Sequence, residues 1–120
     1  MQSSASILIV DDHDGFRTFA RGMLEAAGFT VTEAATGAEA TKAARAVRPG
    51  LVLLDIQLPD QSGIELLQLV REKYDQVLVF IMTNHASEQY RAICRQMGAN
   101  RFFDKSMDFA RISEALAIAC

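Results

Sequence analysis

The sequence predicts an α/β domain in which a parallel sheet of five strands carries helices on both faces. Five apolar segments of strand length are each followed by a segment with helical periodicity, and no linker, repeat or low-complexity stretch interrupts this alternation. Alternation of strand and helix is typical of parallel sheets. The chain has 120 residues, of which 50% are hydrophobic, so we expect residues 1–120 to form one domain with one core.

The first strand is predicted at 7–10, where the sequence ILIV is apolar throughout. A helix is predicted after it at 15–28, with Asp14 placed to cap its start and Gly28 to end it. The residues that form an apolar stripe at helical spacing in this segment are Phe16, Phe19, Ala20, Met23, Leu24 and Ala27.

The second and third units follow directly. FTVTEA at 29–34 alternates between apolar and polar residues, which predicts an edge strand, and a helix is predicted at 36–47. LVLLD at 51–55 is apolar up to its last residue and predicts a central strand. Pro59 then breaks the chain before a helix at 62–74.

The last two units are predicted from the same alternation. VLVFIM at 77–82 predicts a strand buried on both faces, followed by a helix at 87–98. A short strand at 101–104 and a helix at 108–119 complete the pattern. The residues predicted on the inner face of the helix at 87–98 are Tyr90, Ile93, Cys94 and Met97.

The topology follows from the handedness of connections between parallel strands. Right-handed crossovers leave few arrangements for five such units, and the flavodoxin-like strand order 2-1-3-4-5 fits them. The predicted fold is therefore a flavodoxin-like, doubly wound parallel sheet with five helices. In such sheets ligands bind outside the carboxyl ends of the strands, near the switch point between strands one and three.

Composition and charge argue against several classes of protein. The formal charge of −3 gives no electrostatic reason to bind nucleic acid. No apolar run approaches the roughly 20 residues of a membrane span, and MQSSAS at the start does not resemble a signal peptide. Cys94 and Cys120 make no disulfide framework, which fits a reducing compartment. We therefore expect a cytoplasmic protein without direct contact to membrane or nucleic acid.

Acidic residues collect where the first and third predicted strands end. Asp11 and Asp12 follow the first strand, Asp55 ends the third, and these strands are neighbours in the predicted order. Carboxylates this close repel one another unless a cation is present, and Mg²⁺ prefers oxygen ligands. Thr83 and Lys105 follow the fourth and fifth strands at the same edge. This set suits phosphoryl transfer, with Asp55 as nucleophile and with Lys105, Thr83 and a metal stabilising the phosphoryl oxygens.

Each of these residues also has an ordinary structural explanation. An aspartate at the end of a strand often caps the next helix, and this explanation is favoured for Asp11 or Asp12 taken alone. Lys105 alone fits a solvated lysine, and Thr83 alone fits a turn residue. Because five suitable groups converge at the ends of four strands, a functional site is the better interpretation.

The chain resembles the receiver domain of two-component response regulators over essentially its whole length. The segments that carry the resemblance are ILIVDDH, LVLLDIQLPDQSGIELL, VLVFIMTNHA and MGANRFFDKS, in the family's order and spacing. The roles that the resemblance implies are Asp55 as phosphoacceptor, Asp11, Asp12, Asp55 and the backbone carbonyl of Gln57 as Mg²⁺ ligands, Thr83 and Phe102 as switch residues, and Lys105 as the phosphate-contacting lysine.

Three positions depart from the family's commonest pattern. Asn84 follows Thr83 where a small residue is usual, so its amide could narrow access to the phosphoryl site or bond to it. Phe102 replaces a frequent tyrosine. Ser106 replaces the proline that usually follows the lysine. Because a cis peptide bond before a residue other than proline costs about 2.5–4 kcal/mol, we predict a trans bond between Lys105 and Ser106.

Four further polar residues are predicted to lie in solvent. His13 and His85 are close to the site in sequence and could tune the phosphoryl lifetime, but a partly exposed loop histidine is the simpler interpretation of each. Arg91 and Arg95 lie one turn apart on the predicted helix, opposite its apolar stripe. We expect both to be solvated and retain them as candidates for contact with a partner.

Three functions remain open from the sequence. The first is a phosphoacceptor module that takes phosphate from a histidine kinase or phosphotransfer protein, switches the surface of helix four, strand five and helix five, and catalyses only its own phosphorylation and dephosphorylation. The second is an aspartate-nucleophile phosphatase, which needs a second acid where Gln57 stands. The third is a degenerate receiver that binds a partner constitutively.

The output of the first function is not readable from the residues. The chain is expected to be either a stand-alone receiver or a fragment of a longer regulator. Its output partner or fused effector, and a phosphorylation-dependent homodimer, therefore remain open.

Overall fold

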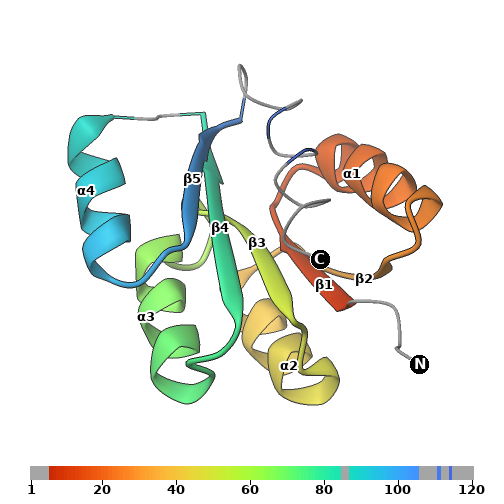
Figure 1. The fold of residues 1–120 in the computed structure, drawn as a ribbon, viewed down its shortest axis with the longest axis horizontal. Helices are drawn as coiled ribbons and strands as arrows, with labels where there is room; N and C mark the ends of the chain where they lie inside the picture. Colours follow the sequence, from red (N-terminus) through yellow and green to blue (C-terminus); the bar gives the residue numbers. More distant parts are fainter. Residues whose placement is uncertain (1–5, 85–86, 106–110, 112–113, 115–120) are drawn as a thin grey trace.

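Five parallel strands form one sheet in the order β2-β1-β3-β4-β5, which is the predicted order with β2 at an edge (Figure 1). The computed structural model describes residues 6–84, 87–105, 111 and 114. The strands are β1 (Ser6–Val10), β2 (Thr30–Ala34), β3 (Leu51–Asp55), β4 (Leu78–Thr83) and β5 (Arg101–Asp104). Each lies within about one residue of its predicted position.

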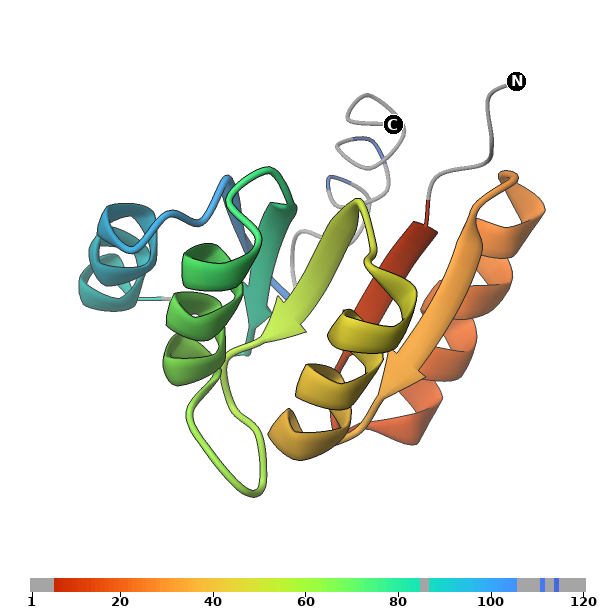
Figure 2. The same cartoon turned by 90° about the horizontal axis from the view of Figure 1, so that it is seen from below.

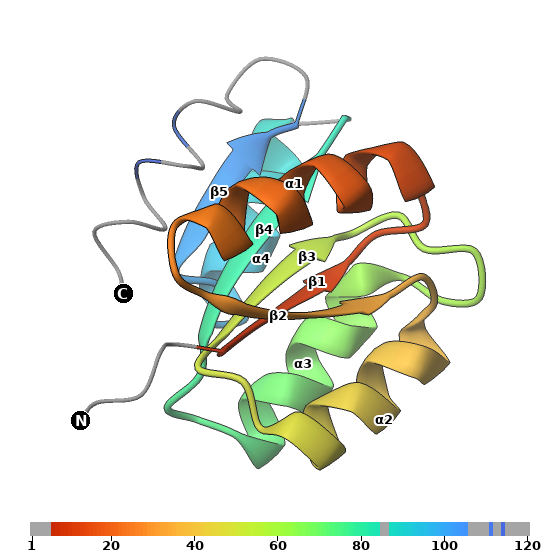
Figure 3. The same ribbon diagram turned by 90° about the vertical axis from the view of Figure 1, so that its right-hand side faces the viewer.

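Four helices lie in the described part of the chain, and they cover both faces of the sheet. They are α1 (Asp14–Ala26), α2 (Gly37–Val47), α3 (Gly63–Lys73) and α4 (Glu88–Gln96). Figure 3 shows α1 on one face and α2 and α3 on the other. The predicted fifth helix at 108–119 falls almost wholly outside the described residues, so it stays a prediction. None of the described helices is long and apolar enough to cross a membrane.

The central strands are buried on both faces, as their uninterrupted apolar sequences predict. In β1, Leu8 and Val10 pack in one cluster with residues of α2 and α3, whereas Ile7 and Ile9 pack in another with residues of α1. Successive side chains of a strand point to opposite faces, so one strand serves two cores. Figure 2 shows the sheet between these helical layers.

The start of α1 differs from the sequence prediction. The N-cap is His13, in an extended conformation without a side-chain capping bond, and Asp14 is the first helical residue. The prediction that Asp14 caps the helix is therefore wrong, because its carboxylate pairs with Arg17 one turn later. The predicted end is confirmed, since Gly28 follows the helix with φ of 99°.

The apolar stripes of α1 and α4 were predicted too wide. Phe19 on α1 is 59% exposed, Tyr90 and Ile93 on α4 are 40% and 41% exposed, and Ala27 after α1 is exposed too, so these four residues do not belong to the core. The buried residues are Ala20 and Leu24 on α1 and Cys94 on α4. A single sheet covers only a narrow strip of each helix, so residues at the margins of an apolar stripe stay in solvent.

Candidate functional site

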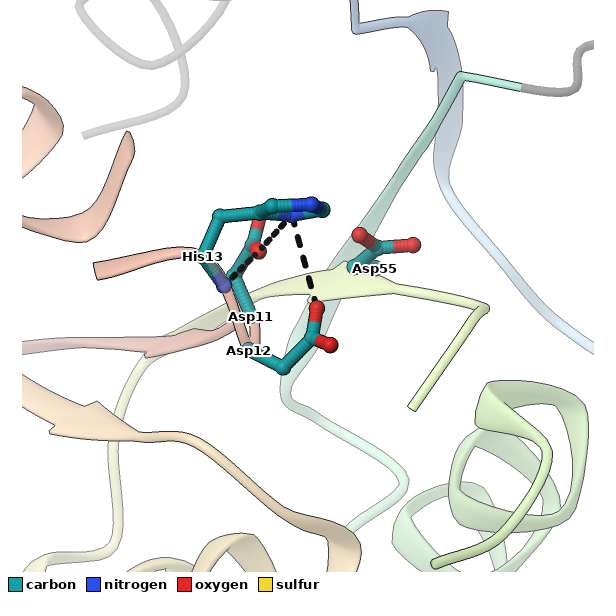
Figure 4. Close-up of side chains that lie close together, drawn as sticks. All are labelled: Asp11, Asp12, His13 and Asp55. Carbon is teal, nitrogen blue, oxygen red and sulfur yellow. Dashed lines mark hydrogen bonds and ion pairs between the residues drawn. The ribbon is translucent and has the colours of Figure 1, made fainter. Parts of the chain in front are cut away.

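Three carboxylates and an imidazole meet at the carboxyl ends of β1 and β3. In the parallel register Val10 pairs with Leu54, so the next residues, Asp11 and Asp55, emerge side by side. Asp12 and His13 continue the chain after β1, and one ligand atom from each of these four residues lies within 4.8 Å of the others. Figure 4 shows the His13 ring and the Asp12 carboxylate facing the end of β3. The predicted acidic pocket is present as a geometric feature.

Asp55 is held in a fixed orientation at the end of β3. Its Oδ1 accepts a hydrogen bond from the backbone N–H of Gln57 at 2.9 Å, and its Oδ2 lies 3.2 Å from Lys105 Nζ. Burial raises the pKa of Asp55, against the opposing effects of the Gln57 hydrogen bond and the Lys105 charge. These two contacts fix the direction of the carboxylate. They offset only part of the cost of burying its charge.

The turn after Asp55 requires glycine where α3 begins. A Cβ on Gly63 would lie 2.4 Å from the Cα of Ile56, and the Gly63 N–H donates to the Ile56 carbonyl at 2.7 Å. The Asp60 carboxylate accepts from the backbone N–H groups of Gly37 and Ala38 at the start of α2. Both bonds lower the pKa of Asp60, and the bond from Gly37 has the larger effect. The segment that carries Gln57 is thus closed by the Gly63–Ile56 bond and held against α2 by Asp60.

Lys105 brings a buried ammonium into the same pocket. Its backbone N–H donates to the carbonyl of Thr83 at 2.8 Å, which joins the ends of β4 and β5. Its Nζ lies 2.5 Å from Asp11 Oδ2, 3.1 Å from His13 Nδ1 and 4.6 Å from the centre of the Phe16 ring. Among the described residues, Asp11 Oδ2 has this ion pair but no well-aligned hydrogen bond.

Arg17 on α1 holds the backbone of Asp11 in place, a role that was not predicted from the sequence. Its side chain is 13% exposed, and its Nη1 donates to the backbone carbonyl of Asp11 at 2.5 Å. Its Nε donates to Glu33 on β2 at 3.0 Å, and Arg21 donates to the same carboxylate at 2.7 Å. Hydrogen bonds from Arg21, and then from Arg17, hold the pKa of Glu33 below its usual value. No short motif marks this contact, because it joins a helix to the neighbouring strand.

Arg91 contacts the predicted switch aromatic instead of lying free in solvent. Its guanidinium carbon lies 4.7 Å from the centre of the Phe102 ring, and Nη1 donates to the Phe102 carbonyl at 3.4 Å. The Phe102 ring is partly buried against the cluster that contains Cys94 of α4. The Arg91 side chain is 34% exposed, so the prediction that it is solvated holds only in part, whereas Arg95 is exposed as predicted.

The structure brings most of the predicted site residues together at one edge of the sheet. Thr83 is fully buried at the end of β4, and Asn84 after it is exposed. Gln57 reaches Asp55 through its backbone N–H, and the role of its carbonyl stays a prediction. His85 and the predicted trans bond at Ser106 fall outside the described residues.

His13 lies closer to the site than the sequence indicated. Its side chain is 59% exposed, as expected for a loop histidine, yet its ring contacts both neighbouring carboxylates and the lysine. Adjacency to two aspartates was the available signal, but the direction of a loop side chain is not readable from sequence.

Comparison with known proteins gives a consistent result. The sequence profile of the response regulator receiver domain matches residues 7–117. The chain is 33% identical over 110 residues to sporulation initiation phosphotransferase F of Bacillus subtilis, covering 92% of this chain and 89% of that protein. It is 33% identical over 119 residues to the nitrate/nitrite response regulator protein NarL of Escherichia coli, covering 96% of this chain and 54% of that protein. The chain thus spans about half the length of NarL, and a similar share, 53%, of a putative transcriptional regulator of Pseudomonas aeruginosa.

Solved structures share the fold. A CheY-like response regulator receiver domain protein from Methanospirillum hungatei superposes with a TM-score of 0.92 at 28% identity, covering 98% of this chain and 94% of that one. The response regulator protein TrrA from Thermotoga maritima, solved in complex with Mg(2+)-BeF, gives a TM-score of 0.85 at 27% identity, covering 97% and 99%. Because the profile match spans most of the chain and the strand order agrees, this chain belongs to the response regulator receiver domain family.

Proposed function

We propose that the chain is the phosphoacceptor module of a two-component phosphorelay, and that Asp55 takes a phosphoryl group from a histidine kinase or phosphotransfer protein. The observation that carries the proposal is the setting of Asp55. Its carboxylate is 2% exposed, oriented by the Gln57 N–H, and faced by the Lys105 ammonium at 3.2 Å. A carboxylate fixed in this way presents its oxygens in one direction, beside a cation that can receive the charge of an incoming phosphoryl group.

The cofactor we propose is Mg²⁺, held by Asp11, Asp12, Asp55 and the backbone carbonyl of Gln57. The donor set fits this ion, since carboxylate oxygens at one pocket need a cation to offset their repulsion. When bound, the ion supplies positive charge to the equatorial phosphoryl oxygens. The Mg(2+)-BeF complex of TrrA supports the choice of metal.

The chemical step needs few groups from this chain. An oxygen of Asp55 attacks phosphorus, the bond from phosphorus to the donor's imidazole nitrogen breaks, and its electron pair returns to the donor ring. Lys105 Nζ binds one phosphoryl oxygen and the Thr83 hydroxyl donates to another. Asn84 and His85 are placed in sequence to tune the lifetime of the product. Apart from this phosphorylation and its reversal by water, we propose no enzymatic activity.

The signal is proposed to leave through α4 and β5, together with the predicted fifth helix. Phosphate on Asp55 would draw the Thr83 hydroxyl inward and let Phe102 occupy the space that it leaves. This is a shift between two populations, which requires the phosphoryl group to bind them unequally.

The proposed output is a partner protein or a fused effector, since the chain resembles both NarL, of which it spans 54%, and sporulation initiation phosphotransferase F, of which it spans 89%. A phosphorylation-dependent homodimer is the alternative form of output. Cys94 is a free buried thiol, which agrees with the cytoplasmic location that we propose.

Labelling with radioactive acetyl phosphate tests this function. We expect the wild type to take up label that depends on Mg²⁺ and is stable in acid and labile in base. The labelling rate of Asp55→Asn should fall at least about 100-fold. Asp75→Asn, which changes an exposed aspartate outside the pocket, should be labelled at the wild-type rate. Undiminished labelling of Asp55→Asn would show that another residue accepts the phosphate. Turnover of many phosphoesters would favour a phosphatase, and no labelling of the wild type would favour a degenerate receiver.

A further inference from the structure

The imidazole of His13 belongs to the acidic pocket, although its residue type differs from the carboxylates around it. Nδ1 lies 3.1 Å from Asp11 Oδ1, 3.4 Å from Asp12 Oδ1 and 3.1 Å from Lys105 Nζ. Figure 4 shows the ring placed above the two neighbouring carboxylates, with Nδ1 turned toward them. Nδ1 therefore lies among negatively charged oxygens and beside a cation.

The contacts of Nδ1 fit two tautomers of the ring. An ammonium has donors and no acceptor, so a hydrogen bond with Lys105 Nζ requires Nδ1 to accept. With the proton on Nδ1, the ring would instead donate to Asp11 Oδ1, also at 3.1 Å. A metal ion selects the tautomer with the proton on Nε2, in which Nδ1 offers its lone pair to the cation.

We propose that His13 is a metal ligand that makes this pocket prefer first-row transition ions such as Zn²⁺ and Co²⁺ over Mg²⁺. Two ligands with bonds of about 2.1 Å to one ion lie about 3.0 Å apart at a right angle and about 3.4 Å apart at the tetrahedral angle. The separations of Nδ1 from the Asp11 and Asp12 oxygens, 3.1 and 3.4 Å, fall in this range. The largest separation in the group, with Asp55 included, is 4.8 Å, so a small inward movement completes the site.

The preference follows from the chemistry of the donors. Mg²⁺ takes oxygen ligands and keeps several waters, so an imidazole adds little to its binding. Zn²⁺, Co²⁺ and Ni²⁺ bind imidazole nitrogen well, so the same nitrogen strengthens their binding. A pocket with three carboxylates alone would discriminate less between these ions. His13 is thus the residue that sets the metal preference of this chain.

The bound ion would take over contacts that Lys105 makes in the structure. Nζ now touches Asp11 Oδ2, Asp55 Oδ2 and His13 Nδ1 with one positive charge. A divalent ion on the Asp11 carboxylate would neutralise its charge, weaken the ion pair of Lys105 with Asp11 and leave the lysine beside Asp55. The inference concerns binding alone, and it does not depend on phosphorylation of Asp55.

Calorimetric titration of the full chain, freed of metal and carrying Cys120→Ser to remove a competing thiol, tests the proposal. We expect Zn²⁺ to bind at least about 100-fold more tightly than Mg²⁺, and excess Mg²⁺ to weaken Zn²⁺ binding by competition. His13→Asn should weaken Zn²⁺ binding at least about tenfold and change Mg²⁺ binding less than about twofold. Asp75→Asn, at an exposed position outside the pocket, is the control, and it should change neither affinity.

A spectroscopic readout separates ligation from an indirect effect on the loop. On addition of Zn²⁺, the Nδ1 resonance of His13 in a long-range proton–nitrogen spectrum should move far more than its Nε2 resonance. Equal Zn²⁺ affinity in wild type and His13→Asn, absence of competition by Mg²⁺, or an unshifted Nδ1 would each overturn the proposal. If any of these results is obtained and acetyl phosphate still labels Asp55, the phosphoacceptor function stands and only the role of His13 as a metal ligand is excluded.

Discussion

At the scale of single residues, Arg17 joins the chain of the acidic pocket to β2. Its side chain is 13% exposed and donates to the Asp11 carbonyl and to the Glu33 carboxylate. Arg21 makes comparable ion pairs on the same helix but is 43% exposed. The two arginines therefore form a matched pair for separating buried from exposed contacts.

Arg17→Met keeps the apolar stem and removes the donors. We expect it to lower the free energy of unfolding by about 1.5–3 kcal/mol, the usual range for hydrogen bonds to charged groups, because the Asp11 carbonyl loses the Arg17 donor and Glu33 keeps only Arg21. Arg21→Met should cost about 0–1 kcal/mol, as exposed ion pairs do. Urea denaturation of both variants measures the difference. Equal losses would mean that the contact with the Asp11 carbonyl contributes nothing specific.

Asp55 makes the stability of the protein depend on pH. Its pKa is raised in the folded state, mainly by burial, so the folded chain holds this proton more tightly than the unfolded chain. Stability is therefore lost as pH rises from the unfolded pKa of about 3.9 through the raised folded value, and it stays lower above that. Asp55→Asn removes this loss. In urea titrations with a chelator present, the variant should gain about 0.5–2 kcal/mol over wild type at pH 7 and much less near pH 4. A gain independent of pH would exclude ionisation of Asp55 as its cause.

At the scale of elements, the contact between α4 and β5 connects the proposed switch to the surface. The Arg91 guanidinium lies over the Phe102 ring at 4.7 Å and also donates to its carbonyl. An inward move of the ring would break this stacking and alter the exposed face of α4, where Tyr90 and Ile93 lie. A change at Asp55 could reach a partner by this route without any movement of the central strands.

Beryllofluoride, which mimics a phosphoryl group on aspartate, tests this connection. With Mg²⁺ present, we expect it to shift the Arg91 Nε–H resonance and the backbone amides of α4 and β5, in addition to those beside Asp55. Asp55→Asn is the control and should show none of these shifts. Changes confined to the acidic pocket, with residues 86–110 unmoved, would contradict the switch.

At the scale of the whole molecule, the sheet was predictable because its pattern is dictated by burial. Strands covered on both faces must be apolar between their ends, and β1, β3 and β4 are, with Ser6, Asp55 and Thr83 as terminal exceptions. Their order then places Asp11 beside Asp55 without any knowledge of side-chain contacts, since parallel neighbours end at the same edge. The acidic pocket could therefore be predicted from the topology.

The residues that support the pocket could not be predicted in this way. The contacts of His13 and Arg17 at the pocket, like that of Arg91 with Phe102, depend on the direction of side chains, and a periodic pattern carries no information about that direction. The same limit explains Phe19, whose place on the apolar stripe of α1 did not reveal that the sheet leaves it exposed. Patterns of burial predict elements, whereas the contacts between elements require coordinates.

Borohydride reduction locates an acyl phosphate directly, because it converts a phosphorylated aspartate to homoserine and leaves free carboxylates unchanged. The full chain would be treated with acetyl phosphate and Mg²⁺, reduced, digested and sequenced by mass spectrometry. We predict homoserine in place of Asp55, dependent on Mg²⁺, with Asp11 and Asp12 unchanged. Homoserine at either of those two positions, or at none while the chain carries label, would contradict the assignment of Asp55 as the phosphoacceptor.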